Sequence, residues 1–443
     1  MRSLNAYIDK HLVGELQEGD GLWRFTYDPG WAASSDGYDL APELSRAAGE
    51  VADGGSKRPV QWYFDNLLPE ELLRQAISRE AGIKGDDAFA LLQYLGAESA
   101  GSLTLLAPGV APPDSAGYCD LPDSQLSRRI RALPRTTLSA GSPKRMSLAG
   151  AQHKLLVASY GGRLYEPMGS APSTHILKPD HPDTAAYPAS ACNEYVTMKM
   201  AGAVGLAVAG VAIRYVPQPV YIIERFDRLV GERQISSDGE LQMDVRRTHI
   251  IDACQLLSRD RLFKHSGASL HALNDIIART TNKLHTRMQL FLWLAYNVAT
   301  ANDDCHLKNL SFHVAADGIK LARHYDLLAT GAYYTQAFAD ERATWPDVPM
   351  AFPLPGARTF AEVTHESLLS AAGEIGLAPT TARRVLAQVL DRMPKALEQQ
   401  TREMRSLHAS LPEAARVHCA AQDRLLRVLD KMIVAPMLER MRC

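Results

Sequence analysis

The sequence has few cysteines, no long hydrophobic run and almost no net charge. Its six cysteines are scattered without a CxxC pair, which argues against a disulfide framework and a zinc ribbon. The longest apolar stretch, residues 200–213, is shorter than the roughly 20 residues that cross a bilayer, and the first residues lack the apolar region of a signal peptide. The formal net charge of -2 gives no global basic field for nucleic acid. We therefore expect a cytoplasmic protein that is neither secreted nor membrane-embedded and that does not bind DNA unaided.

The N-terminal part of the chain combines short strands with amphipathic helices. Residues 4–27 contain short alternating segments broken by glycines, which predict antiparallel strands. Residues 67–83 carry apolar residues at helical spacing, and Gly82 is a suitable C-terminal stop. A second helix is expected at residues 87–95. This part therefore predicts a small module of strands and helices.

The rest of the 443-residue chain is long enough for one or two further domains. Residues 108–145 are rich in Pro, Ser and Gly, which is typical of a connector. Strand-like segments follow at residues 155–159, 174–178 and 220–226, and helices at 193–204, 287–301 and from 366 onward. The predicted organisation is an N-terminal module (1–107), a connector (108–145) and a main body (146–443).

The most informative segment is NDDCHLKN, residues 302–309, directly after a strongly apolar helix. Phosphoryl transfer needs a carboxylate that orients a substrate hydroxyl and an oxygen ligand for magnesium, and kinase loops supply them as an Asp and an Asn five residues apart. Asp304 and Asn309 have this spacing. A polar segment of this kind is also commonly only a solvated turn. A metal site made of Asp304, Cys305 and His306 is a further alternative, although adjacent residues converge poorly on one ion.

A hairpin is expected immediately after this loop. Asp317 and Gly318 are typical of a two-residue turn, and the segments on either side alternate as strands do. This turn pairs the two residues that flank it, and the same register places Asn309 opposite Asp326 at a Cβ separation of about 5 Å. Two oxygen-bearing side chains would then converge on one hard cation.

Three further segments carry residues suited to nucleotide binding. Lys178 ends a strand and Glu194 lies near the start of a helix, in the order of the Lys–Glu ion pair that positions ATP phosphates in kinases. Residues 147–154 (SLAGAQHK) are small enough for backbone N–H groups to approach phosphates, although GxGxxG and GxxxxGK[ST] are lacking. Residues 224–226 end an apolar strand, where backbone groups could bond an adenine edge. Taken singly, such features are more commonly solvated charges, ordinary loops or strand ends.

The order of these segments resembles that of the HipA-like Ser/Thr kinases. SLAGAQHK, THILK, NE, IIERFDR, NDDCHLKN and YDLLAT follow one another as in this family, and FDNLLPEELLR and DDAFALLQYLGAESAG look like its N-terminal signature. The resemblance covers most of the chain. It implies an α+β, two-lobed protein-kinase-like fold with a strand-rich N-terminal module and a helical C-terminal lobe. Residues 146–443 would then form the kinase catalytic domain.

The resemblance also implies an activity and a role for each site residue. The activity is transfer of the ATP γ-phosphate to a protein Ser or Thr, with Mg2+ as cofactor. By position, Asp304 would be the catalytic proton acceptor, Asn309 and Asp326 the Mg2+ ligands, and Ser147 an autophosphorylation site. The implied nucleotide-binding residues are Ala149, Gly150, Ala151, Gln152, His153, Lys154, Lys178, Glu224, Arg225, Phe226, His306, Leu307, Lys308, Asn309, Tyr325 and Asp326.

The sequence departs from ordinary protein kinases because it has no HRD and no DFG, with YDL in place of the latter. The sequence therefore does not indicate which surface recognises a protein target. In the HipA family the toxin pairs with a HipB-like helix-turn-helix antitoxin that binds operator DNA. The resemblance implies this partner, with DNA contact only through the antitoxin complex, and an aminoacyl-tRNA synthetase is one candidate substrate.

Two other functions stay open on the sequence. The pattern Asp304-x-His306-x-x-Asn309 also resembles the loop of phosphoinositide kinases, whose acceptor is a lipid headgroup, although a basic amphipathic segment for a membrane surface is not evident. A pseudokinase could bind nucleotide and act only as a corepressor with its antitoxin. Retention of Asp304, Asn309 and Asp326 argues against the pseudokinase.

The resemblance yields a test on Ser147. A phosphoserine carries a charge of about -1.5 to -2 and would be repelled by nucleotide phosphates, so we expect its formation to push residues 149–154 away from ATP. The stoichiometrically phosphorylated protein should bind Mg-ATP more weakly than unmodified wild type and the Ser147→Ala variant, as measured by titration. A loop serine more often only caps a turn. Equal affinity of the phosphorylated and unmodified proteins would contradict the switch.

Overall fold

The computed structural model describes residues 1–113, 116–146 and 149–442. The chain forms two compact units, each built from segments that are not consecutive in sequence. Strands dominate unit 1 and helices dominate unit 2. The segments of unit 1 are Met1–Lys178, Glu224–Phe263 and Ser311–Ala322, and those of unit 2 are Pro179–Ile223, Lys264–Leu310 and Arg323–Cys443.

The N-terminal strands of unit 1 form an antiparallel sheet, as predicted for residues 4–27. The strand order is β4-β3-β2-β1-β5, and alternate residues along each strand, such as Leu4 and Ala6, are buried as expected for a sheet with one covered face. Trp23 lies edge-on to Phe89 with 5.3 Å between ring centroids. The strands are β1 (Arg2–Ile8), β2 (His11–Gly19), β3 (Leu22–Tyr27), β4 (Glu50–Ala52) and β5 (Leu103–Leu106).

Two helices near this sheet match the predicted segments: α4 agrees with residues 87–95, and α3 ends at Gly82 as predicted but begins at Glu71, later than the predicted start. Gly82 ends α3 in the left-handed conformation at φ 68°, which glycine adopts without a steric penalty. The Asp87 carboxylate accepts a hydrogen bond from the Ala90 N–H at 3.0 Å and so caps α4. The helical elements are α1 (Pro29–Ala33), η1 (Arg46–Ala48), α2 (Pro59–Asp65), α3 (Glu71–Ala81) and α4 (Ala88–Leu95).

A second group of strands in unit 1 includes residues that the sequence assigned to a connector. Strand β6 pairs with β8, with Cys119 opposite Glu166, and Arg129 of the following helix makes two 2.8 Å hydrogen bonds to the Glu166 carboxylate. The predicted connector therefore holds a strand and a helix, which its local composition did not reveal because the pairing is long-range. The elements are β6 (Ala116–Asp120), α5 (Asp123–Ala132), β7 (Leu155–Tyr160), β8 (Arg163–Gly169) and β9 (His175–Pro179).

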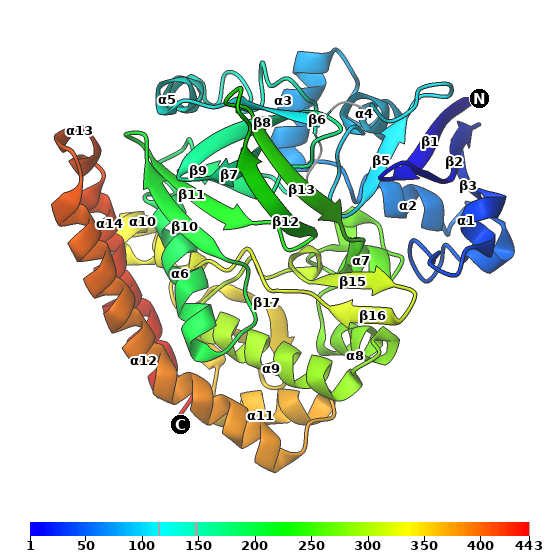
Figure 1. Ribbon diagram of the computed structural model, residues 1–443. Helices are drawn as coiled ribbons and strands as arrows, with labels where there is room; N and C mark the ends of the chain where they lie inside the picture. Colours follow the sequence, from blue (N-terminus) through cyan, green and yellow to red (C-terminus); the bar gives the residue numbers. More distant parts are fainter. Residues whose placement is uncertain (114–115, 147–148, 443) are drawn as a thin grey trace. The chain divides into compact units, whose positions relative to one another are not determined.

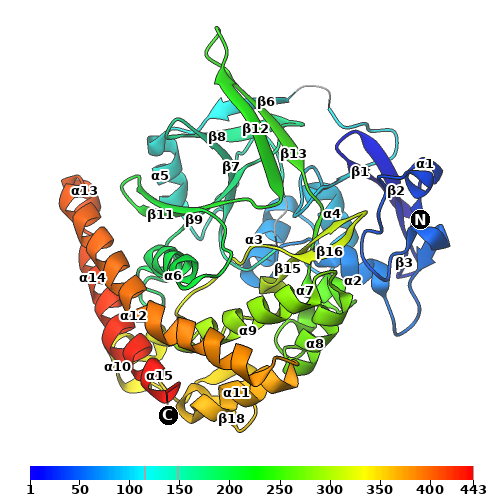
Figure 2. The ribbon, with the colours of Figure 1, turned by 60° about the horizontal axis from the view of Figure 1, so that its bottom comes forward.

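The remaining elements of unit 1 are a long hairpin and a small sheet. In Figure 2 the hairpin β12–β13 forms a two-stranded ribbon whose tip extends away from β6 and β8. The small sheet has the order β14-β15-β16, and α7 begins with a capping box between Asp252 and Gln255. The elements are β12 (Arg228–Ile235), β13 (Leu241–Arg247), β14 (Ile250–Asp252), α7 (Ala253–Leu256), η2 (Arg261–Phe263), β15 (Ser311–Ala315) and β16 (Gly318–Leu321).

The β15–β16 hairpin forms as predicted, but its predicted register is wrong. Ala315 pairs with Gly318, so the turn lies one residue earlier and every cross-strand partner moves by two positions. A two-residue Asp-Gly turn needs positive φ at both central residues, and only Gly318, at φ 109°, has one. Asn309 lies in a 3-10 turn before the strand and Asp326 has φ 57°. They are therefore not cross-strand partners.

A cluster of five charged side chains is buried in unit 1. The Glu98 carboxylate accepts hydrogen bonds from Lys144 at 3.1 Å, Arg225 at 3.0 Å and Arg228 at 3.0 Å, while Asp227 pairs with both arginines at 2.7 and 2.9 Å. Burial alone would raise the pKa of Glu98, but the charges of Lys144, Arg228 and Arg225 hold this pKa well below its usual value. The cluster therefore stays ionised and joins the N-terminal module to residues 225–228.

His249 makes a further link between the N-terminal module and the later segment of unit 1 that follows residue 224. The Nδ1 atom of its buried ring lies 3.0 Å from Ser102 Oγ, and the Nε2 atom lies 2.9 Å from the Leu40 carbonyl oxygen. Since a carbonyl only accepts, Nε2 carries the proton and Nδ1 accepts from the serine. Burial lowers the pKa of His249 to about 4, so the ring is neutral at pH 7.

Unit 2 is built around α9, the helix that the sequence predicted to be buried. Trp293, Phe291 and Tyr296 of α9 are fully buried, and α8, α12 and α15 pack against it. Figure 1 shows the long α12 running past α9 and α6. The elements up to residue 342 are α6 (Ser190–Val204), β10 (Val211–Tyr215), β11 (Pro219–Glu224), α8 (Leu270–Arg279), α9 (Lys283–Ala299), η3 (Leu307–Asn309), η4 (Thr330–Tyr334), α10 (Gln336–Ala339) and η5 (Asp340–Arg342).

The C-terminal part of unit 2 is largely helical, as predicted from residue 366 onward. A short hairpin precedes the helices, and Pro379 occupies the first turn of α12, where its missing N–H costs nothing. Along the described ranges, no helix is long and apolar enough to cross a membrane. The elements are β17 (Pro349–Leu354), β18 (Ala357–Thr359), η6 (Phe360–Glu362), α11 (His365–Glu374), α12 (Pro379–Ser410), α13 (Glu413–Arg416), α14 (Cys419–Val428), η7 (Leu429–Val434) and α15 (Ala435–Arg440).

The buried charge cluster predicts a large stability loss on removal of Glu98. Glu98→Gln keeps the side-chain volume but leaves three buried cations facing only Asp227, and breaking a buried ion pair costs about 3–5 kcal/mol. Urea unfolding at pH 7 measures the loss. Asp120→Asn is the matched control, because the Asp120–Arg163 pair at 2.9 Å is solvent-exposed and such pairs contribute about 0–1 kcal/mol. Equal losses in the two variants would contradict a structural role for the cluster.

Candidate active site

The loop that carries Asp304 begins where the buried helix α9 ends. Thr300 caps the helix by donating its N–H to the Tyr296 carbonyl at 3.0 Å, and Ala301 then adopts φ 52°, which turns the chain sharply out of the helix. The Asn302 N–H returns to the Asn297 carbonyl at 2.9 Å. The loop therefore leaves a rigid helix end in a defined direction.

Buried amide groups hold the loop in place. Asn302 Nδ2 donates to Asn297 Oδ1 at 2.8 Å, and Asn302 Oδ1 accepts from the Asp304 N–H at 3.1 Å. Thr330 Oγ1 accepts from the Asp303 N–H at 2.8 Å. Since satisfied buried polar networks rigidify a site, these contacts fix the backbone of Asp304.

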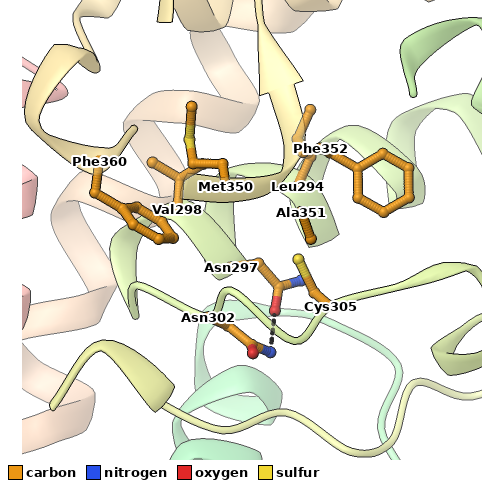
Figure 3. A pocket seen from close by; sticks show the side chains of 9 residues that line it. All are labelled: Leu294, Asn297, Val298, Asn302, Cys305, Met350, Ala351, Phe352 and Phe360. Atoms are coloured by element: carbon orange, nitrogen blue, oxygen red, sulfur yellow. Dashed lines mark hydrogen bonds between the residues drawn. The ribbon is translucent and has the colours of Figure 1, made fainter. Parts of the chain in front are cut away.

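The packing behind the loop leaves only a very small cavity. Its volume is about 10 Å3, which is at the lower limit for one water molecule and far below the volume of a nucleotide. Figure 3 shows the hydrogen bond between Asn302 and Asn297 beside it. The lining residues come from α9, the loop, β17 and η6: Leu294, Asn297, Val298, Asn302, Cys305, Met350, Ala351, Phe352 and Phe360.

The Asp304 side chain is exposed while its backbone is anchored. Its side chain is 56% exposed, so a substrate hydroxyl can reach it. The Asp304 carbonyl accepts from the His306 N–H at 2.9 Å and from Asn309 Nδ2 at 2.9 Å. A hydrogen bond therefore joins Asn309 directly to Asp304. The sequence had related these two residues only by their spacing.

Tyr325 connects this loop to the segment that contains Asp326. Its hydroxyl donates to the Lys308 carbonyl at 2.6 Å, so the residues directly preceding Asn309 and Asp326 are in contact. The hydrogen bond from Asn309 Nδ2 to a carbonyl fixes the amide orientation, which leaves Oδ1 as the oxygen available to a cation. The structure thus brings the two predicted metal ligands into neighbouring segments of unit 2, although by a hydrogen bond and not by strand pairing.

Helix α6 anchors the segment after Asp326. Asn193 Nδ2 donates to the Ala329 carbonyl at 3.1 Å, and Asn193 Oδ1 accepts from the Ala329 N–H at 2.9 Å. Glu194, the next residue, is buried. Burial, followed by the negative charges of Glu194 and Asp326, raises the pKa of Tyr221 well above its usual value. The Lys178–Glu194 ion pair stays a prediction.

The predicted phosphate loop lies in unit 1 and contacts the start of α3. The Glu70 N–H donates to the Gly150 carbonyl at 3.2 Å, and Gly150 has φ 108°. Lys154 Nζ donates to the Ala149 carbonyl at 2.5 Å. The pairing of strands β7 and β9 ends with Leu155 opposite Leu177. Lys154 and Lys178 are the next residues on each side, so they lie at the adjoining ends of these two strands. Two ammonium groups there suit an anionic ligand.

Residues 224–226 are held from two sides within unit 1. The Arg225 N–H donates to the Thr174 carbonyl at 2.9 Å, and its guanidinium is buried in the charge cluster with Glu98 and Asp227. Glu224 is exposed, and the Phe226 ring lies edge-on to His313 at 6.0 Å between centroids. The Arg225 carbonyl accepts from the Arg228 N–H at 3.3 Å, and a carbonyl oxygen can accept a second hydrogen bond. Any adenine contact by Arg225 would therefore use this second position, because its side chain and N–H have other partners.

The implied site residues are divided between the units. Unit 2 holds Asp304, His306, Leu307, Lys308, Asn309, Tyr325 and Asp326, and unit 1 holds Ala149, Gly150, Ala151, Gln152, His153, Lys154, Lys178, Glu224, Arg225 and Phe226. Ser147 lies outside the described residues. The nucleotide, metal and autophosphorylation roles of these residues stay predictions.

Sequence reasoning did not single out four residues that organise the site. Asn302 and Thr330 fix the Asp304 loop, Asn193 holds the segment after Asp326, and His265 lies 3.9 Å from the Asp304 carboxylate. Asn193 and Asn302 stand inside the segments NE and NDDCHLKN, so their place in those segments was a signal. Thr330 also stands inside such a segment, YDLLAT. His265 carries no local signal, because it reaches the loop only through the fold.

Comparisons with known proteins place the chain in a family. The family model for the HipA-like C-terminal domain matches residues 146–397, and the model for the HipA N-terminal domain matches residues 4–106. A relative named putative kinase Y4mE, from Sinorhizobium fredii, is 31% identical over 414 residues, which cover 90% of this chain and 91% of the relative. The chain therefore belongs to the HipA-like family, as the resemblance of its motifs predicted.

Two further comparisons concern a named toxin and a solved complex. The serine/threonine-protein kinase toxin HipA of Shewanella oneidensis is 26% identical over 352 residues, covering 75% of this chain and 76% of the toxin. A HipA chain in the complex of HipA, HipB and operator DNA from Shewanella oneidensis matches the structure with a TM-score of 0.75 and 22% identity, covering 98% of this chain and 99% of that one. This likeness confirms the predicted HipA-like α+β fold class.

Proposed function

We propose that this protein is an ATP-dependent Ser/Thr protein kinase that acts as the toxin of a bacterial toxin–antitoxin pair. The observation that carries the proposal is the exposed Asp304 carboxylate on a loop whose backbone is fixed by Asn302, Thr330 and Asn309. Phosphoryl transfer depends mainly on positioning and electrostatics. A rigid loop with an accessible carboxylate meets that requirement.

Asp304 is the residue that would accept the proton of the attacking hydroxyl. Its anchored backbone and exposed side chain allow it to orient a Ser or Thr hydroxyl within hydrogen-bonding distance. His306 and Lys308 belong to the same loop and are buried, so they shape the loop more than they contact a large substrate. A protein acceptor fits the accessible position of Asp304.

Asn309 and Asp326 are suited to hold Mg2+. Both offer oxygen, which is the donor that this hard cation prefers, and the Tyr325–Lys308 hydrogen bond keeps their segments together. Bound Mg2+ would supply positive charge that offsets the negative charge of the phosphates.

Residues 149–154 and Lys178 are suited to the ATP phosphates. Gly150 has a backbone conformation that places its amide in a tight loop, and two lysines stand at the adjoining ends of β7 and β9. The Arg225 carbonyl, which accepts from the Arg228 N–H, can accept a second hydrogen bond from an adenine amino group. The relatives named as kinases support phosphoryl transfer as the reaction.

The proposed partner is a HipB-like helix-turn-helix antitoxin. The complex of HipA, HipB and operator DNA to which this fold is similar supports this proposal, and the net charge of -2 favours DNA contact through the partner over direct binding. The protein target and the modification of Ser147 belong to the proposal as well.

The first test removes the proposed proton acceptor. Asp304→Asn should leave folding and ATP binding nearly intact while phosphoryl transfer to protein falls by about 100-fold or more, the scale of a positioned general base. Transfer is measured with γ-labelled Mg-ATP. Asp303→Asn is the matched control, since the Asp303 carboxylate accepts from the Tyr334 hydroxyl and an amide oxygen can do the same. Unchanged transfer in Asp304→Asn would reject the assignment.

The second test concerns the proposed Mg2+ ligands. Mg-ATP at 100 times its dissociation constant should stabilise wild type against thermal unfolding by about 2.7 kcal/mol. Asn309→Ala and Asp326→Ala should lose most of this stabilisation, because each removes one oxygen ligand. Wild type with ATP and a chelator provides the reference for metal-independent binding. Full Mg-ATP stabilisation of Asp326→Ala would show that this carboxylate does not hold the metal.

A further inference from the structure

A second group of ligand side chains surrounds Asp304 in unit 2. His265 Nε2 lies 3.9 Å from Asp304 Oδ1, and the His265 and His306 rings meet edge-on with 4.8 Å between centroids and 78° between planes. One nitrogen or oxygen atom from each of these three residues lies within 4.8 Å of those of the other two. They therefore form a compact set of potential ligands.

The backbone holds the three residues together. The Leu307 N–H donates to the Lys264 carbonyl at 3.1 Å, so the residues adjacent to His265 and His306 are directly joined. His306 is buried, with 7% of its surface exposed, whereas the side chains of His265 and Asp304 are half exposed. His306 is thus held inside the protein, whereas His265 and Asp304 are accessible to solvent.

The donor set differs from that proposed for Mg2+. Two imidazoles and one carboxylate are a donor set of Zn2+ and related ions, whereas Mg2+ prefers oxygen. Zn2+ bonds to its ligands are about 2.0–2.2 Å long, so the present separations need a modest inward rotation, which the half-exposed His265 can make. The third ligand is His265, from another segment, because its imidazole lies within reach of the other two ligand atoms. Cys305 is buried and is not part of this group.

We propose that His265, His306 and Asp304 bind a transition-metal ion such as Zn2+, and that this ion inhibits phosphoryl transfer. A carboxylate bound to a metal ion is a much weaker proton acceptor, so occupancy of this site hinders the proposed role of Asp304. The binding part stands on the geometry alone. The inhibitory part rests on the proposed function.

Metal binding is tested on the full-length protein without nucleotide. Co2+ is titrated and followed by its visible absorption, and Zn2+ is titrated calorimetrically. His271→Ala is the matched control, because His271 is an exposed histidine 3.6 Å from a carboxylate, Asp275, on the same unit. Wild type and His271→Ala should bind one ion equally, and His265→Ala should bind it more than about tenfold more weakly, since even supporting contacts contribute 10- to 100-fold. Equal affinity of His265→Ala and wild type would overturn the site.

Inhibition is tested by titrating Zn2+ into the transfer assay at constant excess Mg-ATP. Each variant is normalised to its own rate without Zn2+, which removes any effect of the substitution on the rate itself. His265→Ala should need more than about tenfold more Zn2+ than wild type for half inhibition, in proportion to its weaker binding. The same inhibitory concentration for both would overturn the regulatory role. If no variant transfers phosphate, the proposed kinase function fails, while the nucleotide-free titrations still decide whether the metal site exists.

Discussion

Unit 1 depends on the buried carboxylate of Glu98. Three cations, Lys144, Arg225 and Arg228, donate to this one group. Its loss would remove the carboxylate that Lys144 contacts and would leave the two arginines to share Asp227. Such a cluster contributes less to net stability than to defining a single arrangement, because desolvation offsets much of the Coulomb attraction. Its consequence for function is specific. The guanidinium of Arg225 is fixed, so the strand end at residues 224–226 has one backbone position.

The N-terminal module is therefore a structural part of the proposed nucleotide-binding half. Glu98 fixes Arg225, and the start of α3 holds the Gly150 carbonyl through the Glu70 N–H. In unit 2, buried amides fix the Asp304 loop in a comparable way. In both units, polar side chains inside the protein hold backbone segments, while the Asp304 carboxylate, which is proposed to contact the substrate hydroxyl, stays exposed. This division suits a site whose catalysis depends on preorganised charge.

Elements with strong local patterns could be predicted from the sequence, and features set by distant contacts could not. Helix α9 and the loop after it were predicted because an unbroken apolar helix and a polar segment adjoin in the sequence. The hairpin register was wrong because the actual turn, at Ala316 and Asp317, does not adopt the positive φ values that an Asp-Gly turn requires. Glu98 and His265 were missed since a charged or polar residue carries no sign of burial or of a distant partner.

The central claim is that this protein transfers the ATP γ-phosphate to a protein Ser or Thr. The most direct measurement incubates the purified protein with labelled Mg-ATP, alone and with a bacterial lysate, and maps new phosphosites by mass spectrometry. The account predicts label on a Ser or Thr of the protein itself or of a lysate protein. Label found only in lipid, or nucleotide binding without any transfer, would contradict it.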